Sequence, residues 1–299
     1  MPRLLFVTLS NIGDLVMTTP ALVALHEAFP EAVIDVVADR RSSELLRHAP
    51  FLGTLFHRDK REGLPGILRL LGALFRQHYE AVVDLRTDWL PWLLRTRHRS
   101  SRLITGATGE HSTTQHFAVV APLLPRDTVM PAARVWTDPQ SELAARNLLA
   151  PLGERILAVA PGANWAGKCW AASSFAATAA ALRETFDSLV VLGSAADAGA
   201  AAELMARSNM PSLDLCGRTS LLEAAAVLRR CSVFLGNDSG LGHIAAAVGI
   251  PTVTVFGPGK PARYRPFGPR SEIVCAKNQD LGALAPWPVV EAIQRLSAG

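Results

Sequence analysis

The stretch "FLGNDSGLGHIAAAVGIPTVTVFGP", residues 234–258, decides the fold. Its pattern predicts a short apolar strand, a polar turn, a helix of small residues and a second apolar strand. Two parallel neighbouring strands need a crossover such as this helix, so the unit is typical of a parallel sheet. The polar turn either caps the helix or holds an anion on the free backbone N–H groups of the first helical turn.

The bulk composition describes a globular, core-rich protein. A length of 299 residues fits two domains of about 150 residues each. Hydrophobic residues make up 49% and charged residues 19%, which excludes a disordered chain. The net charge of +4 is mild, and histidines and aromatic residues are scattered, so we expect no nucleic-acid partner.

The cysteines and apolar runs indicate a soluble cytoplasmic protein. No CxxC pair and no Cys/His spacing suits a zinc site, so we expect reduced thiols and no metal. The apolar run after Arg3 is shorter than the roughly 7–15 residues of a signal-peptide core. No apolar stretch reaches the ~18–20 residues that span a bilayer.

Strands and helices alternate along both halves of the chain. This alternation predicts an α/β fold with two doubly wound parallel sheets. A stretch rich in Gly and Pro interrupts the alternation, and we place the linker at 122–140 between domains 1–135 and 136–299. The expected strands are 3–9, 32–38, 53–57, 80–85, 155–162, 188–194, 232–237 and 251–257, and the expected helices are 13–30, 42–49, 64–77, 173–186, 198–208, 220–231 and 288–296.

In such folds ligands bind at the carboxyl ends of the strands, so polar turns at those ends are candidate sites. In the turn 10–22, Asp14 follows Gly13 at the start of a helix. Its carboxylate either favours the helix dipole or acts as a general base. Thr219 or Ser220 begins another helix and is an N-cap candidate.

The turn "PGANWAGKCW", residues 161–170, carries a lysine between two tryptophans. Lys168 offers a mobile ammonium that suits a phosphate, and Gly162 allows close backbone approach. A loop lysine is more often merely solvated, but Trp165 and Trp170 beside it favour a packing or binding role.

In the turn of the opening stretch, Asp238 or Ser239 can cap the helix. Gly240 and Gly242 permit close approach of a ligand, and His243 lies one turn into the helix. The pattern is neither GxGxxG nor a Walker A motif, which counts against a dinucleotide dehydrogenase and a P-loop ATPase.

The basic segment "LLRTRHRSSRL", residues 93–103, is most simply a solvated face. If the segment lines a cleft, its charges would instead suit an acidic acceptor. If it faces a membrane, they would favour an anionic lipid surface. The segment includes Arg95, Arg97, His98, Arg99 and Arg102.

Three motifs resemble glycosyltransferase family 9, the bacterial ADP-heptose:lipopolysaccharide heptosyltransferases. They are "IGDLVMTTPALVAL" with the following "FPEAVIDVV", then "GKCWAASSFA", then "GNDSGLGHIAAAVGIPTVTVFGP", in the family's order and spacing. Together they span nearly the whole chain, although residues from about 84 to 135 match nothing recognisable.

The resemblance implies a GT-B fold, two Rossmann-like domains facing across a cleft, with the acceptor on the N-terminal domain and the nucleotide sugar on the C-terminal domain. It implies an inverting enzyme that needs no metal or other cofactor and moves a heptose from ADP-heptose to a lipopolysaccharide inner-core hydroxyl. The residues that it assigns are Asp14 as catalytic base; Lys168, Asp238, Ser239, Gly240 and His243 for the donor's diphosphate and sugar; Gly162, Asn164, Asp197, Thr219 and Ser220 as less certain donor contacts; and Asn11, Gly13, Arg95, Arg97 and Arg99 as acceptor contacts.

Some residues depart from the family pattern. Ala171 replaces a proline that often follows the tryptophan of the lysine motif, and Asp197 is a shifted candidate for the ribose contact. Other acceptors therefore stay open: a protein or a small secondary metabolite in place of an acidic glycan or glycolipid. A non-catalytic sugar-nucleotide-binding protein and a GT-B epimerase are further alternatives, as is peripheral contact with the inner membrane.

Overall fold

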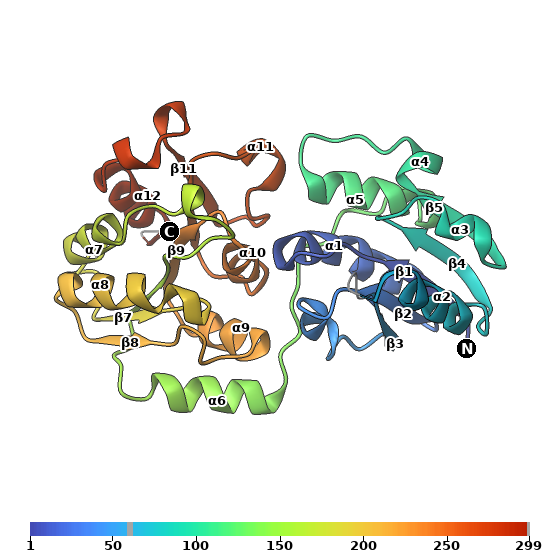
Figure 1. The fold of residues 1–299 in the computed structure, drawn as a ribbon, viewed down its shortest axis with the longest axis horizontal. Coiled ribbons are helices and arrows are strands. Elements are labelled where there is room, and N and C mark those ends of the chain that lie inside the picture. The colour runs from blue at the N-terminus through green and yellow to red at the C-terminus, as the bar shows by residue number, and fades with distance from the viewer. Residues whose placement is uncertain (59–61, 298–299) are drawn as a thin grey trace. The chain divides into compact units, whose positions relative to one another are not determined.

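The computed structural model describes residues 1–58 and 62–297 and divides the chain into two compact units, Met1–Trp136 and Thr137–Gly299. Each unit is built on one sheet with helices against it (Figure 1). Every strand pairing recorded within the described residues is parallel. The α/β fold class with two parallel sheets, expected from the strand–helix alternation, is confirmed.

In the first unit the strand order is β3-β2-β1-β4-β5, so the order reverses beside β1. The turns after β1 and β4 therefore emerge at the topological switch point, where ligands of open α/β sheets bind. The strands are β1 (Arg3–Val7), β2 (Val33–Ala38), β3 (Leu52–His57), β4 (Tyr79–Asp84) and β5 (Thr96–Ser101), and the helices are α1 (Ile12–Ala28), η1 (Ser43–Leu46), α2 (Gly63–Leu74), α3 (Leu90–Leu93), α4 (Arg102–Thr105), α5 (Ser112–Val120) and η3 (Ala121–Leu123).

Helix α1 is buried along most of its length and carries Pro20 in its interior. Proline lacks the N–H that would bond to the carbonyl of Val16 four residues earlier. The Thr19 hydroxyl donates to that carbonyl instead, at 2.7 Å, and accepts from the backbone N–H of Arg134 at 3.0 Å. The hydrogen bond from Thr19 thus keeps α1 continuous through Pro20. Helix α1 therefore begins a few residues after the end of β1 and runs without a break.

In the second unit the strand order is β11-β10-β9-β6-β7-β8, and it reverses between β9 and β6. The turns after these two strands are the lysine turn and the turn of residues 237–243, so both lie at the switch point. The strands are β6 (Ile156–Ala160), β7 (Ser188–Val191), β8 (Ser212–Asp214), β9 (Val233–Asn237), β10 (Thr252–Phe256) and β11 (Ser271–Cys275), and the helices are α6 (Pro139–Leu149), η4 (Ala166–Lys168), α7 (Ala172–Ala181), η5 (Ala195–Asp197), α8 (Ala198–Ser208), α9 (Leu221–Arg229), α10 (Gly240–Ala247), α11 (Pro261–Tyr264), η6 (Lys277–Gln279), η7 (Leu281–Ala283) and α12 (Trp287–Ser297).

The structure differs from the sequence expectations mainly where local patterns are weak. Strand β5 lies in the basic segment, where no apolar alternation marks a strand, and is held by parallel pairing with β4. Strands β8 and β11 were not expected. Helix α7 ends at Ala181, five residues before the expected end, and the expected linker overlaps both η3 and the start of α6.

Candidate functional site

Asn237 at the end of β9 ties three chain segments together. Its side chain is fully buried. The Oδ1 atom accepts from the backbone N–H of Trp170 at 2.9 Å, and the Nδ2 atom donates to the carbonyl of Pro161 at 2.6 Å. The two ends of the lysine turn are therefore fastened to the turn that follows β9. Sequence reasoning missed this residue, because a buried Asn and a solvated turn Asn look alike in sequence.

Lys168 and Asp238 form an ion pair across these two turns. Nζ of Lys168 lies 2.5 Å from Oδ2 of Asp238, with side chains 25% and 12% exposed. The pair brings together two residues that are 70 positions apart and that sequence analysis assigned to one site. Partial burial orients the ammonium and leaves part of it accessible.

Helix α10 begins two residues after Asp238 and presents its N-terminus at the same strand end. Ser239 occupies the N-cap position with extended backbone but makes no capping bond through its side chain. Its hydroxyl oxygen is buried and has no hydrogen-bond partner among the described residues. Gly240 is the first helical residue, and His243 is buried one turn later. The uncapped N-terminus is suited to an anion.

The lysine turn itself is shaped by glycines. A Cβ at Gly162 would lie 2.3 Å from Oδ1 of Asp197, so only glycine lets the turns after β6 and β7 approach so closely. Asn164 is exposed, and the half-exposed Trp165 covers Gly167. The structure thus places Gly162 and Asp197 together beside the switch point.

Asp197, Ser220 and Thr219 are less certain donor residues, and the side chains of the first two form hydrogen bonds within the chain. Oδ2 of Asp197 accepts from both the backbone N–H and the hydroxyl of Ser194, at 2.7 and 2.8 Å. The Ser220 hydroxyl accepts from the backbone N–H of Glu223 at 3.1 Å, which makes it the N-cap of α9. Thr219, beside this cap, is half-buried.

Cysteine chemistry is not favoured near the lysine. Cys169 follows Lys168 directly, and burial raises the pKa of its thiol. Burial likewise raises the pKa of Cys216, to about 12, with a further contribution from Asp214. Both thiols are protonated at neutral pH and are poor nucleophiles.

In the first unit, Asp14 lies in the first turn of α1, directly after the carboxyl end of β1. Nδ2 of Asn11 donates to Oδ2 of Asp14 at 2.8 Å, and this contact is exposed. Gly13 between them is buried. This hydrogen bond orients the carboxylate of Asp14 directly after the carboxyl end of β1.

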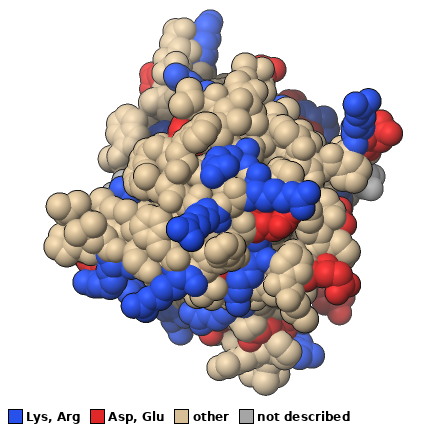
Figure 2. All heavy atoms as spheres, turned by 90° about the vertical axis from the view of Figure 1, so that its right-hand side faces the viewer, with Lys and Arg blue, Asp and Glu red and all other residues tan. Residues whose placement is uncertain are grey.

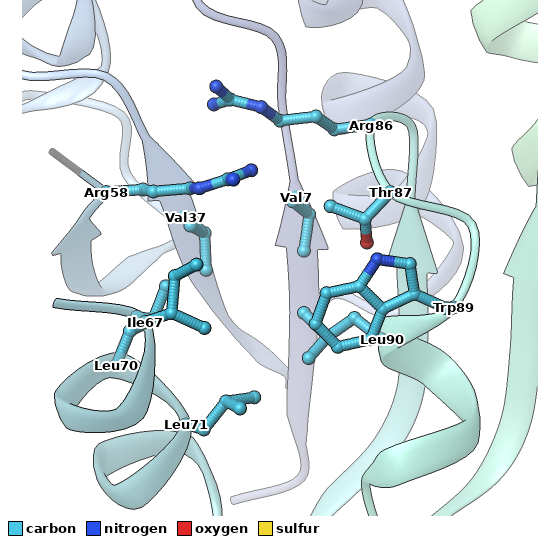
Figure 3. Close-up of a pocket in the computed structure, with 10 residues that line it drawn as sticks. All are labelled: Val7, Val37, Arg58, Ile67, Leu70, Leu71, Arg86, Thr87, Trp89 and Leu90. Carbon is cyan, nitrogen blue, oxygen red and sulfur yellow. The ribbon is translucent and has the colours of Figure 1, made fainter. Parts of the chain in front are cut away.

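A pocket lies at the same edge of this sheet, and sequence analysis did not identify it. Its floor is apolar and is formed by the ends of β1 and β2, by α2 and by the start of α3. Arg58 and Arg86 extend over it (Figure 3). Burial lowers the pKa of Arg86, and Arg58 lowers it further. The Nη1 atom of Arg86 is buried without a hydrogen-bond partner among the described residues. Two guanidiniums over an apolar floor suit an anionic group.

The three arginines expected to contact an acceptor are exposed at the edge strand β5. Arg97 pairs with Glu80 at 3.2 Å, and Arg99 lies 5.9 Å from the ring centre of Trp92. Arg95 immediately precedes the strand. Arg95 and Arg97 are therefore near the amino end of β5, whereas Asp14 follows a carboxyl end.

Within residues 1–58 and 62–297, no group of three or more His, Cys, Asp and Glu side chains is placed to hold a metal ion. Over the same residues, no helix combines the length and apolar character needed to cross a membrane.

Comparison with known proteins identifies the family. The family model for glycosyltransferase family 9 (heptosyltransferase) matches residues 67–284, which include the segment that resembled nothing by motif. Lipopolysaccharide heptosyltransferase 3 of Escherichia coli K12 is 26% identical over 85% of this chain and 82% of its own length.

Two solved structures show the same fold. An E. coli ADP-heptose lps heptosyltransferase II structure has a TM-score of 0.79 at 22% identity, covering 99% of this chain and 98% of that one. A family 9 transferase from Veillonella parvula has a TM-score of 0.86 at 20% identity, covering 99% and 97%. The fold is therefore GT-B, with two Rossmann-like domains. Because the family model matches well over half of the chain, the protein belongs to glycosyltransferase family 9, the heptosyltransferases, and is a sugar-transferring enzyme.

Proposed function

We propose that this enzyme transfers a heptose from ADP-heptose to a hydroxyl of the lipopolysaccharide inner core, with inversion and without a metal ion. The donor and acceptor follow the names of its relatives, an ADP-heptose lps heptosyltransferase and a lipopolysaccharide heptosyltransferase. The observation that carries the proposal is the Lys168–Asp238 pair beside the uncapped N-terminus of α10.

The second unit supplies the leaving-group side of the reaction. The ammonium of Lys168 and the backbone N–H groups at Gly240 stabilise the diphosphate as the sugar–oxygen bond breaks. The carboxylate of Asp238 would repel a phosphate, so it holds Lys168 and accepts hydrogen bonds from sugar hydroxyls. The buried hydroxyl of Ser239 is a donor for the same ligand.

The first unit supplies the base. The carboxylate of Asp14 takes the proton of the acceptor hydroxyl, whose oxygen attacks the anomeric carbon opposite the diphosphate. A carbon–oxygen bond forms to the acceptor, the bond to the diphosphate breaks, and ADP leaves. Asn11 positions the carboxylate through its amide.

The pocket below Arg58 and Arg86 favours an acidic acceptor. Its guanidiniums match a carboxylate or phosphate on an inner-core glycan or on the lipid that carries it. A lipid-linked acceptor also implies contact with the inner face of the cytoplasmic membrane.

Calorimetry with ADP, UDP and GDP tests the donor site directly. We expect ADP to bind best and Lys168→Ala to weaken it by about 10- to 100-fold, since a charge-assisted hydrogen bond to phosphate is lost. Lys277→Ala, an exposed lysine on η6, is the matched control and should bind like the wild type. Preference for UDP or GDP would overturn the ADP-heptose assignment.

Transfer assays test the acceptor and the metal independence. Labelled heptose should pass to inner-core lipid and not to a peptide or a small aromatic acceptor, and the rate should persist in a chelator. Transfer to peptide alone, or loss of activity in the chelator that added Mg²⁺ restores, would contradict the proposal.

A further inference from the structure

Helix α2 of the first unit is apolar on its outer side as well as on its inner side. Leu74 is fully buried, but Leu64 and Leu68, one turn apart, are 67% and 60% exposed. Arg69 is the one charged residue of the helix. A helix that is apolar all round is normally covered on every side. Among the residues that the structure describes, nothing covers the outer side of α2.

Other exposed apolar side chains fall in the part of the chain that follows α2. Among the described residues, eight of the thirteen large apolar side chains recorded as exposed fall between positions 64 and 104. Besides the two leucines of α2 they include Phe75, Trp92 and Leu103. Helix α2 and the start of α3 line one pocket, and α3 and α4 both contact β5. We call the exposed side chains of 63–105 the α2–α4 face.

The same face is rich in arginine. Residues 63–105 contain seven arginines and no lysine, against Glu80, Asp84 and Asp88, and Asp84 is fully buried. Neither Arg76 nor Arg95 pairs with a carboxylate of the described residues. Figure 2 shows this side of the molecule, where Lys and Arg side chains lie among uncharged ones.

We propose that the α2–α4 face docks on an anionic lipid bilayer. Leucine and tryptophan side chains enter the headgroup region while arginines meet lipid phosphates, the combination used by interfacial segments. Tryptophan suits that depth because it has an apolar ring and one polar N–H. A second copy of the chain fits less well, because a twofold contact would set the same arginines against each other.

The proposal rests on the proposed function for the lipid-linked acceptor, and it gives the membrane contact a defined surface. The bilayer would then hold the first unit, which carries Asp14, close to lipid-linked substrate. The test measures lipid binding alone. The docking proposal can therefore fail while ADP binding and sugar transfer are confirmed, and it can hold while those two fail.

The experiment is co-sedimentation with vesicles. We expect the protein to bind vesicles of phosphatidylethanolamine and phosphatidylglycerol, to bind phosphatidylcholine vesicles poorly, and to release at high salt. Trp92→Ser should lower the partition about tenfold because an apolar ring no longer inserts. Trp287→Ser is the matched control: its side chain is 60% exposed, against 64% for Trp92, and lies on the second unit.

Charge is tested separately. Arg76→Gln should lower the partition about fivefold, since one arginine near an anionic surface is lost. Arg183→Gln, an exposed arginine of the second unit, should have no effect. Equal binding to both kinds of vesicle would overturn the proposal, as would equal effects of Trp92→Ser and Trp287→Ser. A dimer in solution that Trp92→Ser dissociates would assign the face to a second copy instead.

Discussion

The turn after β1 in the first unit and the turn after β9 in the second both lie beside the switch point of their sheets, but they are held very differently. After β9, Asn237 is fully buried and bonds to two backbone groups, and Asp238 pairs with Lys168. After β1, an exposed hydrogen bond joins Asn11 to Asp14.

A buried polar cluster of the first unit lies at the opposite end of its sheet. Asp35 is fully buried and accepts from Arg3, Thr54 and Tyr79. Arg3 and Tyr79 are the first residues of β1 and β4. The second unit is thus preorganised at the carboxyl edge of its sheet, which suits a donor with fixed charges. The first unit has buried carboxylates at both ends of its sheet: Asp35 at one end and, at the other, Asp84, which accepts from the backbone N–H groups of Arg86 and Thr87.

Removing the base should have the largest effect. Asp14→Asn keeps the shape but cannot take the acceptor proton, so kcat should fall about 10²- to 10⁴-fold while ADP affinity stays unchanged. The control is Asp127→Asn, an exposed carboxylate of the same unit. Full transfer activity in Asp14→Asn, measured with labelled heptose, would refute the assignment.

The next effect tests how firmly the two turns are held. Asn237→Ala leaves the N–H of Trp170 and the carbonyl of Pro161 unpaired in the interior, so the free energy of unfolding should fall by about 2–3 kcal/mol. Asn11→Ala should cost under about 0.5 kcal/mol because its contact is exposed. Urea denaturation of both variants compares the two turns. Equal losses of unfolding free energy would show that the turns are held equally firmly.

The free energy of unfolding at alkaline pH tests the buried cluster around Asp35 in the first unit. Burial, with the nearby carboxylate of Asp35, raises the pKa of Tyr79. The unfolded chain therefore loses this proton first, and the stabilisation that Tyr79 provides below its unfolded pKa near 10 is lost as pH rises above it. The slope from this one group is at most about 1.4 kcal/mol per pH unit. Urea midpoints between pH 8 and 11 should fall less steeply in Tyr79→Phe, and an unchanged slope would contradict this.

The smallest effect separates capping from donor binding at Ser220. Ser220→Ala removes the N-cap of α9 and should cost about 1 kcal/mol of stability. Because its hydroxyl already accepts from Glu223, ADP affinity should not change. A marked loss of ADP binding by calorimetry would make Ser220 a donor contact.

Much of the site could be predicted because it follows strand ends. Lys168, Asp238 and Ser239 lie in turns that follow apolar strands and precede helices, a pattern legible in sequence. The pocket of the first unit could not be predicted in this way. Arg58 and Arg86 follow β3 and β4 in unremarkable sequence, and only the sheet order places both beside the end of β1.

The sequence by itself determined the strand–helix alternation, the polar turns and the family, because these depend on periodicity and on motifs of adjacent residues. It also limited the N-cap of α9 to Thr219 or Ser220, and the structure shows that the cap is Ser220. Only the tertiary structure decided that Asn237 is a buried tie, that β5 is a strand and that no other described residue covers the outer side of α2. Burial and parallel pairing join residues far apart in the chain, and no local pattern records them.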